Sequence, residues 1–193
     1  MTDINPKASE YQEYRQAIRE LCAQFDSKYW QEVEERGGYP EAFVKALTDA
    51  GWLAALIPEA YGGGGLSITE ASVILEEINR SGANSGACHA QMYVMGALVR
   101  HGSDEQKRRY LPGIASGDLR LQSFAVTEPT TGTDTTKTRT TAVRRGDRYI
   151  VNGQKVWISR IQHSDLMLLL ARTKWMERRK VMGIEVASAG GAA

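Results

Sequence analysis

The residues best suited to chemistry are a hydroxyl-rich loop, residues 124–134, and a later aromatic and hydroxyl pair, Trp157 and Ser159. The loop follows a short apolar stretch and offers the Thr127 and Thr133 hydroxyls together with backbone N–H groups. We predict that the later pair lies on a strand, where residues two apart share a face, so the indole and the hydroxyl should point the same way. An aromatic wall with donors aimed at a polar edge suits a flat heteroaromatic ligand such as a flavin. Ordinary β domains that bind no ligand also contain threonine-rich loops and strand tryptophans.

Other polar motifs favour structural roles. The glycine run 62–65 lacks the strand, helix and Gly-Lys-Ser/Thr spacing of a phosphate loop, so we expect a tight turn there. His89, His101 and His163 match no metal-ligand spacing, so no metal site is predicted. We expect Glu128 to accept hydrogen bonds from loop amides rather than to act as a base.

Composition limits the class of protein. The 193 residues carry a net charge of +1, which argues against nucleic-acid binding. Cys22 and Cys88 are not in a Cys-x-x-Cys spacing, so we expect buried thiols in a reducing compartment. The longest aliphatic run, residues 166–171, is too short to cross a bilayer, and the first residues do not resemble a targeting segment. We therefore expect a cytoplasmic protein with no membrane span.

The first 118 residues have the periodicity of helices. Apolar residues at three- and four-residue steps predict one long helix over 9–36 and another over 85–100. Ser67 and Ser103 each begin a capping-box pattern, which marks the start of a helix. Five helices joined by short glycine-containing turns predict an N-terminal α-helical bundle domain over residues 1–118.

From residue 119 the pattern changes to that of strands. We predict strands over 119–126, 140–144, 148–151, 155–159 and 165–172. An Arg-Gly-Asp turn and an Asn152-Gly153 hairpin turn connect them, since Asn-Gly tolerates a positive φ. The fold class is therefore α+β, with a partial antiparallel β domain over 119–172. Residues 173–193 show no such periodicity, so we expect a non-matching, disordered tail and a chain truncated or altered after about residue 173.

Several stretches resemble the acyl-CoA dehydrogenase family. They are residues 51–53, 57–63, 102–112, 124–134, 146–159 and 168–172, in the family's order. The resemblance implies a helical domain, a middle β domain and a C-terminal four-helix domain, usually in a homo-oligomer. It also implies FAD as cofactor, an acyl-CoA substrate desaturated between Cα and Cβ, and an electron-transfer acceptor.

The resemblance also implies a set of cofactor-binding residues. They are Phe124, Val126, Thr127, Gly132, Thr133, Trp157, Ile158 and Ser159. Thr127 would serve the pyrimidine edge of the flavin, and Trp157 would pack against its rings. Ser159 would donate to flavin N5, the atom that accepts hydride, while Thr133 would also contact the CoA part of the substrate. The 85–100 helix would line the acyl tunnel.

Two departures from the family bear on activity. Arg160 stands where Asn is frequent, which leaves the identity of the acyl group open. The family's catalytic base is a glutamate of the C-terminal domain, and nothing after Arg172 resembles that domain, so no catalytic residue is assigned here. Loss of a general base costs about 10² to 10⁴ in rate. We therefore expect an FAD-dependent oxidoreductase by ancestry that is inactive alone; the alternative is a non-catalytic helical remnant that binds acyl-CoA or another protein.

Overall fold

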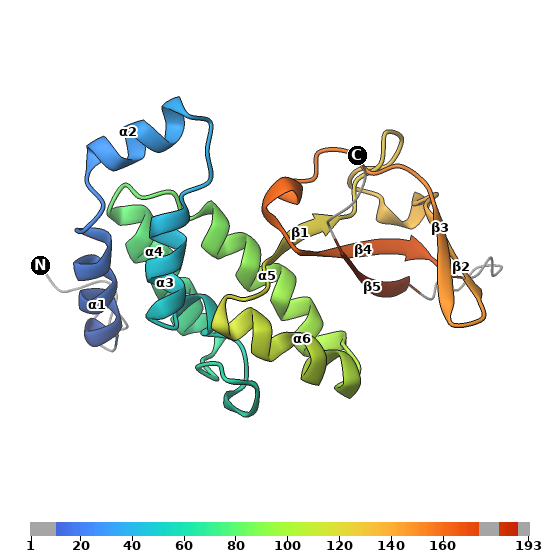
Figure 1. The fold of residues 1–193 in the computed structure, drawn as a ribbon, viewed down its shortest axis with the longest axis horizontal. Helices are drawn as coiled ribbons and strands as arrows, with labels where there is room; N and C mark the ends of the chain where they lie inside the picture. The colour runs from blue at the N-terminus through green and yellow to red at the C-terminus, as the bar shows by residue number, and fades with distance from the viewer. Residues whose placement is uncertain (1–10, 174–181, 189–193) are drawn as a thin grey trace, which may run out of the picture.

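The computed structural model describes residues 11–173 and 182–188, which form a helical half followed by a sheet (Figure 1). The helices are α1 (Gln12–Cys22), α2 (Ser27–Glu35), α3 (Glu41–Asp49), α4 (Ile68–Arg80), α5 (Gly86–His101) and α6 (Asp104–Ser116). The strands are β1 (Leu121–Ala125), β2 (Thr141–Arg145), β3 (Arg148–Asn152), β4 (Leu166–Arg172) and β5 (Met182–Ser188). The predicted α+β class is confirmed.

Helix caps explain where the helices begin. The predicted single helix over 9–36 is wrong, because its described part divides into α1 and α2. The Asp26 side chain accepts a hydrogen bond from the Tyr29 amide at 2.9 Å, and this cap starts a separate helix. Both predicted capping boxes are confirmed, at Ser67 before α4 and at Ser103 before α6.

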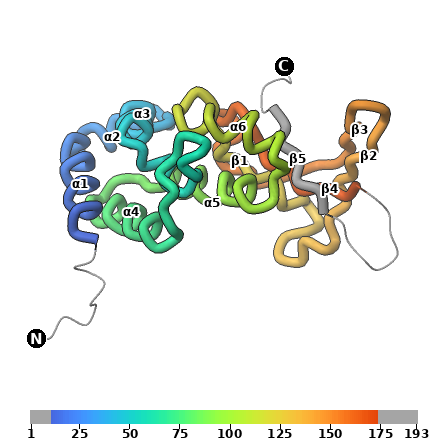
Figure 2. Tube along the Cα trace, turned by 90° about the horizontal axis from the view of Figure 1, so that it is seen from below, coloured from blue at the N-terminus to red at the C-terminus, as the bar shows by residue number. Residues whose placement is uncertain are grey.

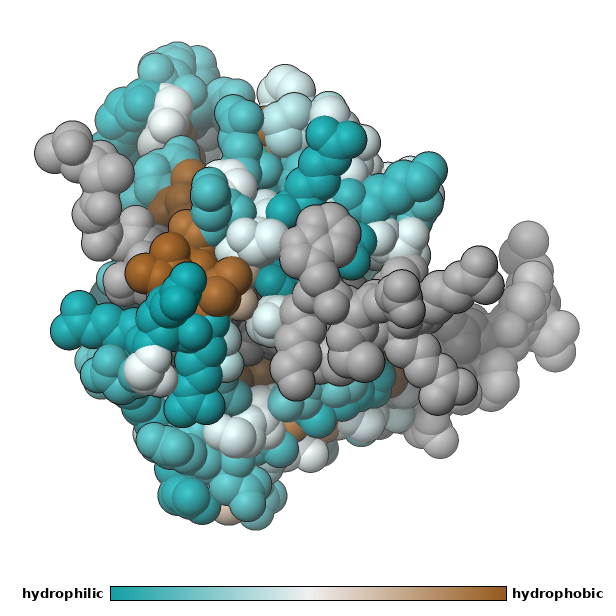
Figure 3. Space-filling view, turned by 90° about the vertical axis from the view of Figure 1, so that its right-hand side faces the viewer, coloured by the Kyte–Doolittle hydropathy of each residue, from teal (hydrophilic) through white to brown (hydrophobic). Residues whose placement is uncertain are grey.

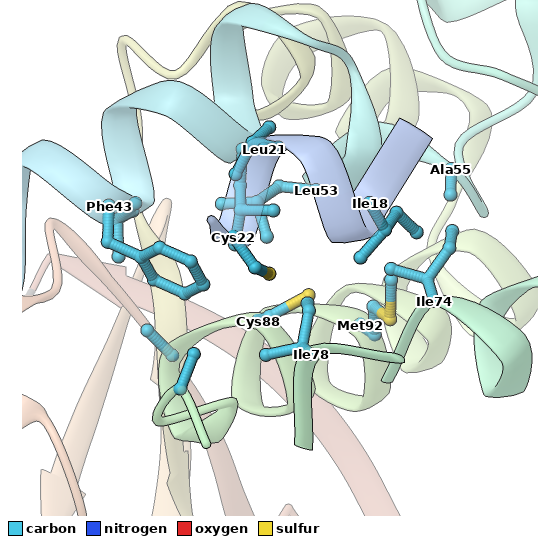
Figure 4. Close-up of a cluster of buried hydrophobic side chains, with 14 of the residues drawn as sticks. Ile18, Leu21, Cys22, Phe43, Leu53, Ala55, Ile74, Ile78, Cys88 and Met92 are labelled. Atoms are coloured by element: carbon cyan, nitrogen blue, oxygen red, sulfur yellow. The ribbon is translucent and has the colours of Figure 1, made fainter. Parts of the chain in front are cut away.

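The first hydrophobic cluster fills the helical half. Cys22 and Cys88 lie in it among apolar side chains that include Ile18, Phe43 and Ile78 (Figure 4). Burial raises the pKa of Cys88 to about 12, so this thiol stays protonated near neutral pH. The prediction that both cysteines are buried is confirmed.

The sheet is mixed, and the predicted antiparallel sheet is wrong in this respect. β4 pairs in parallel with β1 and, at Thr141–Arg172, with β2, while β5 and β4 are antiparallel. A chain that returns to the sheet through a long connection can place its strands in parallel. The segment between β1 and β4 is such a connection, and its β2–β3 hairpin lies at the end of the sheet.

The β2–β3 hairpin turns at the Arg-Gly-Asp sequence, as predicted. Gly146 there has a φ of 64°, which a glycine adopts without steric cost. Val143 and Ile150 of this hairpin are 47% and 59% exposed. Figure 3 views the molecule from the sheet end and shows a hydrophobic patch among hydrophilic side chains.

Two predictions for the segment after β3 are wrong. Residues 155–159 form no strand, and Asn152-Gly153 is not a tight hairpin turn between strands. Gly153 instead allows a close approach to Thr140, since a Cβ there would lie 2.4 Å from the Thr140 Oγ1. The segment therefore approaches Thr140 and the Thr127 loop without pairing as a strand.

The expected tail contains a strand. Residues 174–181 and 189–193, on which much of the prediction of a disordered tail falls, lie outside the described residues. β5 pairs with β4 along its whole length, from Leu166–Ser188 to Arg172–Met182. The expectation of a disordered tail after residue 173 is therefore wrong for residues 182–188. The sequence pattern did not predict this strand, because backbone hydrogen bonds between strands form without an apolar periodicity.

A second hydrophobic cluster joins the two halves. It contains Leu111 and Ile114 of α6, Leu121 of β1 and Leu168 of β4, all fully buried. α5 packs against β1, so the helical half lies directly against the sheet (Figures 1 and 2). Within residues 11–173 and 182–188, no helix is long and apolar enough to span a membrane.

Candidate functional site

Glu128 organises the loop that follows β1. Its carboxylate accepts hydrogen bonds from the Arg139 and Thr140 amides at 2.7 and 2.8 Å and pairs with Lys155 Nζ at 3.0 Å. Burial alone would raise the pKa of Glu128, but the Thr140, Arg139 and Lys155 donors lower it to about 2. Glu128 is thus a buried structural anion, which confirms that it serves loop amides.

Backbone and lysine contacts bring the loop and the tryptophan segment together. The Val156 amide donates to the Thr127 carbonyl at 3.0 Å, and Lys155 Nζ donates to the Val126 carbonyl at 2.8 Å. These contacts, rather than a strand ladder, hold the two segments side by side. The role of Lys155 was not predicted from the sequence. Its only signal there is its position between the turn-forming Asn152-Gly153 pair and the apolar Val156.

A second attachment holds the end of this segment on β1. The Ser123 hydroxyl lies 3.4 Å from the Ser159 carbonyl and 2.9 Å from the Ser164 hydroxyl. The Ser164 hydroxyl in turn donates to the Arg160 carbonyl at 2.9 Å. The backbone next to Ser159 is therefore fixed relative to the strand that leads into the loop.

Trp157 projects into solvent. Its φ is 61°, an uncommon conformation for a bulky residue, and its side chain is 89% exposed. The argument that Trp157 and Ser159 share a strand face therefore does not apply. A large apolar side chain held out at a fixed position is typical of a surface that binds something.

Three hydroxyls of the site have no partner in the described part of the chain. They belong to Thr127, which is half-buried, and to Thr133 and Ser159, which are exposed. The hydroxyls of Thr136 and Thr138 nearby are bonded within the loop. The site thus presents donors and acceptors that the fold itself does not use.

The remaining candidate residues form the border of the site. Phe124 is half-buried, packs on the second cluster and lies 6.1 Å from the Tyr93 ring, between centroids. Ile158 packs against a third cluster that includes Ala125 and Ala142, and Val126 is half-buried. Gly132 is exposed, with open space where a Cβ would lie. The site therefore combines an exposed indole with hydroxyls that have no partner among the described residues, the kinds of group that bind a flat ring with a polar edge.

Two family models match the chain in sequence. The acyl-CoA dehydrogenase N-terminal domain matches residues 8–118, and the acyl-CoA dehydrogenase middle domain matches residues 123–190. The chain belongs to the acyl-CoA dehydrogenase family. The middle-domain match includes β5 and extends beyond Arg172.

Individual relatives agree with this assignment. Acyl-CoA dehydrogenase FadE12 of Mycobacterium tuberculosis is 33% identical over 176 residues, which are 90% of this chain and 45% of that protein. An acyl-CoA dehydrogenase crystal structure from Geobacillus kaustophilus matches with a TM-score of 0.83 and 30% identity, over 93% of this chain and 48% of that one. The ChsE4-ChsE5 complex from Mycobacterium tuberculosis matches with a TM-score of 0.78 and 33% identity, over 97% and 48%. The chain spans less than half the length of these relatives.

Proposed function

We propose that this chain supplies the flavin-binding face of an FAD-dependent acyl-CoA dehydrogenase. The observation that carries the proposal is the contact between the Thr127 loop and the Trp157 segment through the Val156 amide and Lys155. These two segments carry an 89% exposed indole and three hydroxyls that have no partner among the described residues. A flat ring with a polar edge would gain an aromatic contact from the indole and hydrogen bonds from the hydroxyls, and these contacts would stabilise its complex with the protein. Family membership makes FAD the ring to test first.

Each residue then has a defined task. Thr127 and the nearby loop amides bind the pyrimidine edge, and Trp157 covers the ring face and keeps water away. Ser159 orients the ring by a hydrogen bond at N5, and its position is set by Ser123 on β1. Thr133 binds the CoA part of the thioester. FAD, when bound, accepts the hydride that leaves the substrate Cβ.

The proton must leave Cα to a base that we do not find among the described residues of the site. Glu128 is a carboxylate of the loop, but Lys155 and two amides hold it as an anion in the protein interior. By family resemblance, the base is a glutamate of the C-terminal domain. We therefore propose that the 193-residue chain alone binds flavin without turning over acyl-CoA.

The family resemblance also suggests partners. We propose an acyl-CoA thioester as substrate, a separate electron-transfer acceptor, and association with further copies or relatives of the chain. The ChsE4-ChsE5 structure is a complex of two different chains, which makes a relative a reasonable partner to test. The competing proposal is a non-catalytic module that binds acyl-CoA without flavin.

Flavin binding distinguishes the two proposals. The 193-residue protein is titrated with FAD while flavin fluorescence and the visible spectrum are recorded. We expect saturable binding of FAD by the parent. Trp157→Ala, which removes the aromatic contact, should weaken binding about tenfold or more. The Thr127→Val, Ser159→Ala double variant should weaken it to a similar extent, since each polar contact contributes about 0.5–1.5 kcal/mol. Ser72→Ala, an exposed hydroxyl of α4, is the control and should bind as the parent does. Binding of acyl-CoA without any flavin binding would favour the non-catalytic module.

A further inference from the structure

Arg160 occupies a constrained position beside the candidate flavin site. It follows Ser159 directly and has a φ of 59°, a conformation that few arginines adopt. Its carbonyl accepts hydrogen bonds from the Ser164 hydroxyl at 2.9 Å and the His163 amide at 3.0 Å. The side chain reaches the start of α5.

The Arg160 guanidinium lies across Gly86, the first residue of α5. A Cβ built on Gly86 would be 2.0 Å from the Arg160 Nη2 and 3.1 Å from its Cζ. Any residue larger than glycine at this position would therefore displace the guanidinium. Gly86 and Arg160 are thus complementary in shape, although they are separated by more than 70 residues in the sequence.

The guanidinium has no carboxylate partner among the described residues. It is half-buried, yet it forms no ion pair or side-chain hydrogen bond there. Arg120, which lies over the Tyr39 ring, is by contrast paired with Glu41 through an Nη1–Oε1 distance of 3.0 Å. The first turn of α5 contains no acidic residue, and its amides add positive potential. A half-buried cation without a partner is costly and calls for an anion.

We propose that Arg160 is a specificity-determining residue that binds a carboxylate on the acyl group of the CoA thioester. This inference rests on the proposed function, since it uses the flavin-binding role of Ser159. Because Ser159 is assigned to the hydride-accepting atom and Thr133 to CoA, the neighbouring Arg160 lies at the acyl end of the site. A planar guanidinium binds a carboxylate through two parallel hydrogen bonds, which an aliphatic chain end cannot form.

Equilibrium binding of two thioesters of equal carbon number tests the inference. Glutaryl-CoA carries a terminal carboxylate, and pentanoyl-CoA carries a methyl group in its place. Both are titrated by calorimetry into the FAD-saturated 193-residue protein and into its Arg160→Gln, Arg160→Lys and Gly86→Ala variants. We expect the parent to bind glutaryl-CoA at least about tenfold more tightly, because hydrogen bonds to charged groups contribute about 1.5–3 kcal/mol.

The variants make the outcomes distinguishable. Arg160→Gln should abolish the preference and leave pentanoyl-CoA binding unchanged, while Arg160→Lys should keep part of it. Gly86→Ala, which displaces the guanidinium, should also abolish the preference. Equal binding of both thioesters by the parent, or a preference that survives in Arg160→Gln, would refute the role of Arg160 and leave the proposed function standing. Equal weakening of both thioesters in Arg160→Gln would mean that the guanidinium binds the CoA phosphates, which also refutes it. Binding of neither thioester would refute the proposed function together with this inference.

Discussion

At the scale of single residues, the site depends on a buried charge pair that sequence reasoning did not identify. Glu128 and Lys155 have side chains only 3% and 9% exposed. Together they attach the loop after β1 to the segment that carries Trp157. The two segments of the candidate site are therefore held together by this pair.

Replacing one member of this pair should be costly. We expect Glu128→Gln to lower the free energy of unfolding by about 3–5 kcal/mol, because it leaves the Lys155 ammonium buried without its counter-charge. Urea denaturation followed by circular dichroism measures the change. Glu34→Gln, on an exposed face of α2, is the control and should change stability by less than about 0.5 kcal/mol.

The same pair predicts a dependence on pH. The pKa of Glu128 is about 2 in the folded protein and about 4.3 in an unfolded chain. Its contribution is therefore fully present above about pH 5 and decreases as pH falls toward 2. We expect the stability difference between the parent and Glu128→Gln to shrink over this range in urea titrations. A difference that stays constant from pH 6 to pH 3 would contradict this account.

At the scale of elements, close backbone approach determines the turn between α3 and α4. A Cβ on Gly63 would lie 2.1 Å from the Ile57 carbonyl oxygen, which is backbone and cannot rotate away. Gly51 instead has a φ of 78° and open space around its Cβ position. The interpretation of the glycine run as a tight turn is therefore confirmed. Gly63 must be a glycine because the Ile57 backbone leaves no room for a side chain, and not because its φ is positive.

These two glycines form a matched pair of tests. We expect Gly63→Ala to destabilise the protein by about 3 kcal/mol through overpacking, since the backbone must move. Gly51→Ala should cost about 1 kcal/mol, the penalty of a left-handed alanine. Thermal unfolding of both variants measures the difference. Equal losses would show that the Gly63 contact relaxes easily.

At the scale of the whole molecule, one hydrophobic cluster couples the helices to the sheet. Leu168 of β4 is fully buried against residues of α6, and the two halves of the chain share this core. We expect Leu168→Ala to cost about 2–5 kcal/mol and to raise amide hydrogen exchange in α6 as well as in β4. Ile150→Ala, on the exposed hairpin, should leave exchange in α6 unchanged. Exchange that rises only in the sheet would mean that the halves unfold independently.

The sequence by itself determined the local features of this protein. Capping boxes at Ser67 and Ser103 and the Arg-Gly-Asp turn were all predictable, because each depends on residues close together in the chain. The loop and tryptophan motifs also predicted the family, which the family models confirm.

Only the tertiary structure decided how distant segments meet. The parallel pairing of β4 with β1 depends on contacts between residues about 45 positions apart in sequence. The addition of β5 and the positive φ of Trp157 were likewise not predicted from the sequence. The Glu128–Lys155 pair and the approach of Arg160 to Gly86 also join residues far apart in sequence. Periodicity reports which face of a segment is apolar, whereas pairing direction and the partner of a buried charge follow from the path of the whole chain.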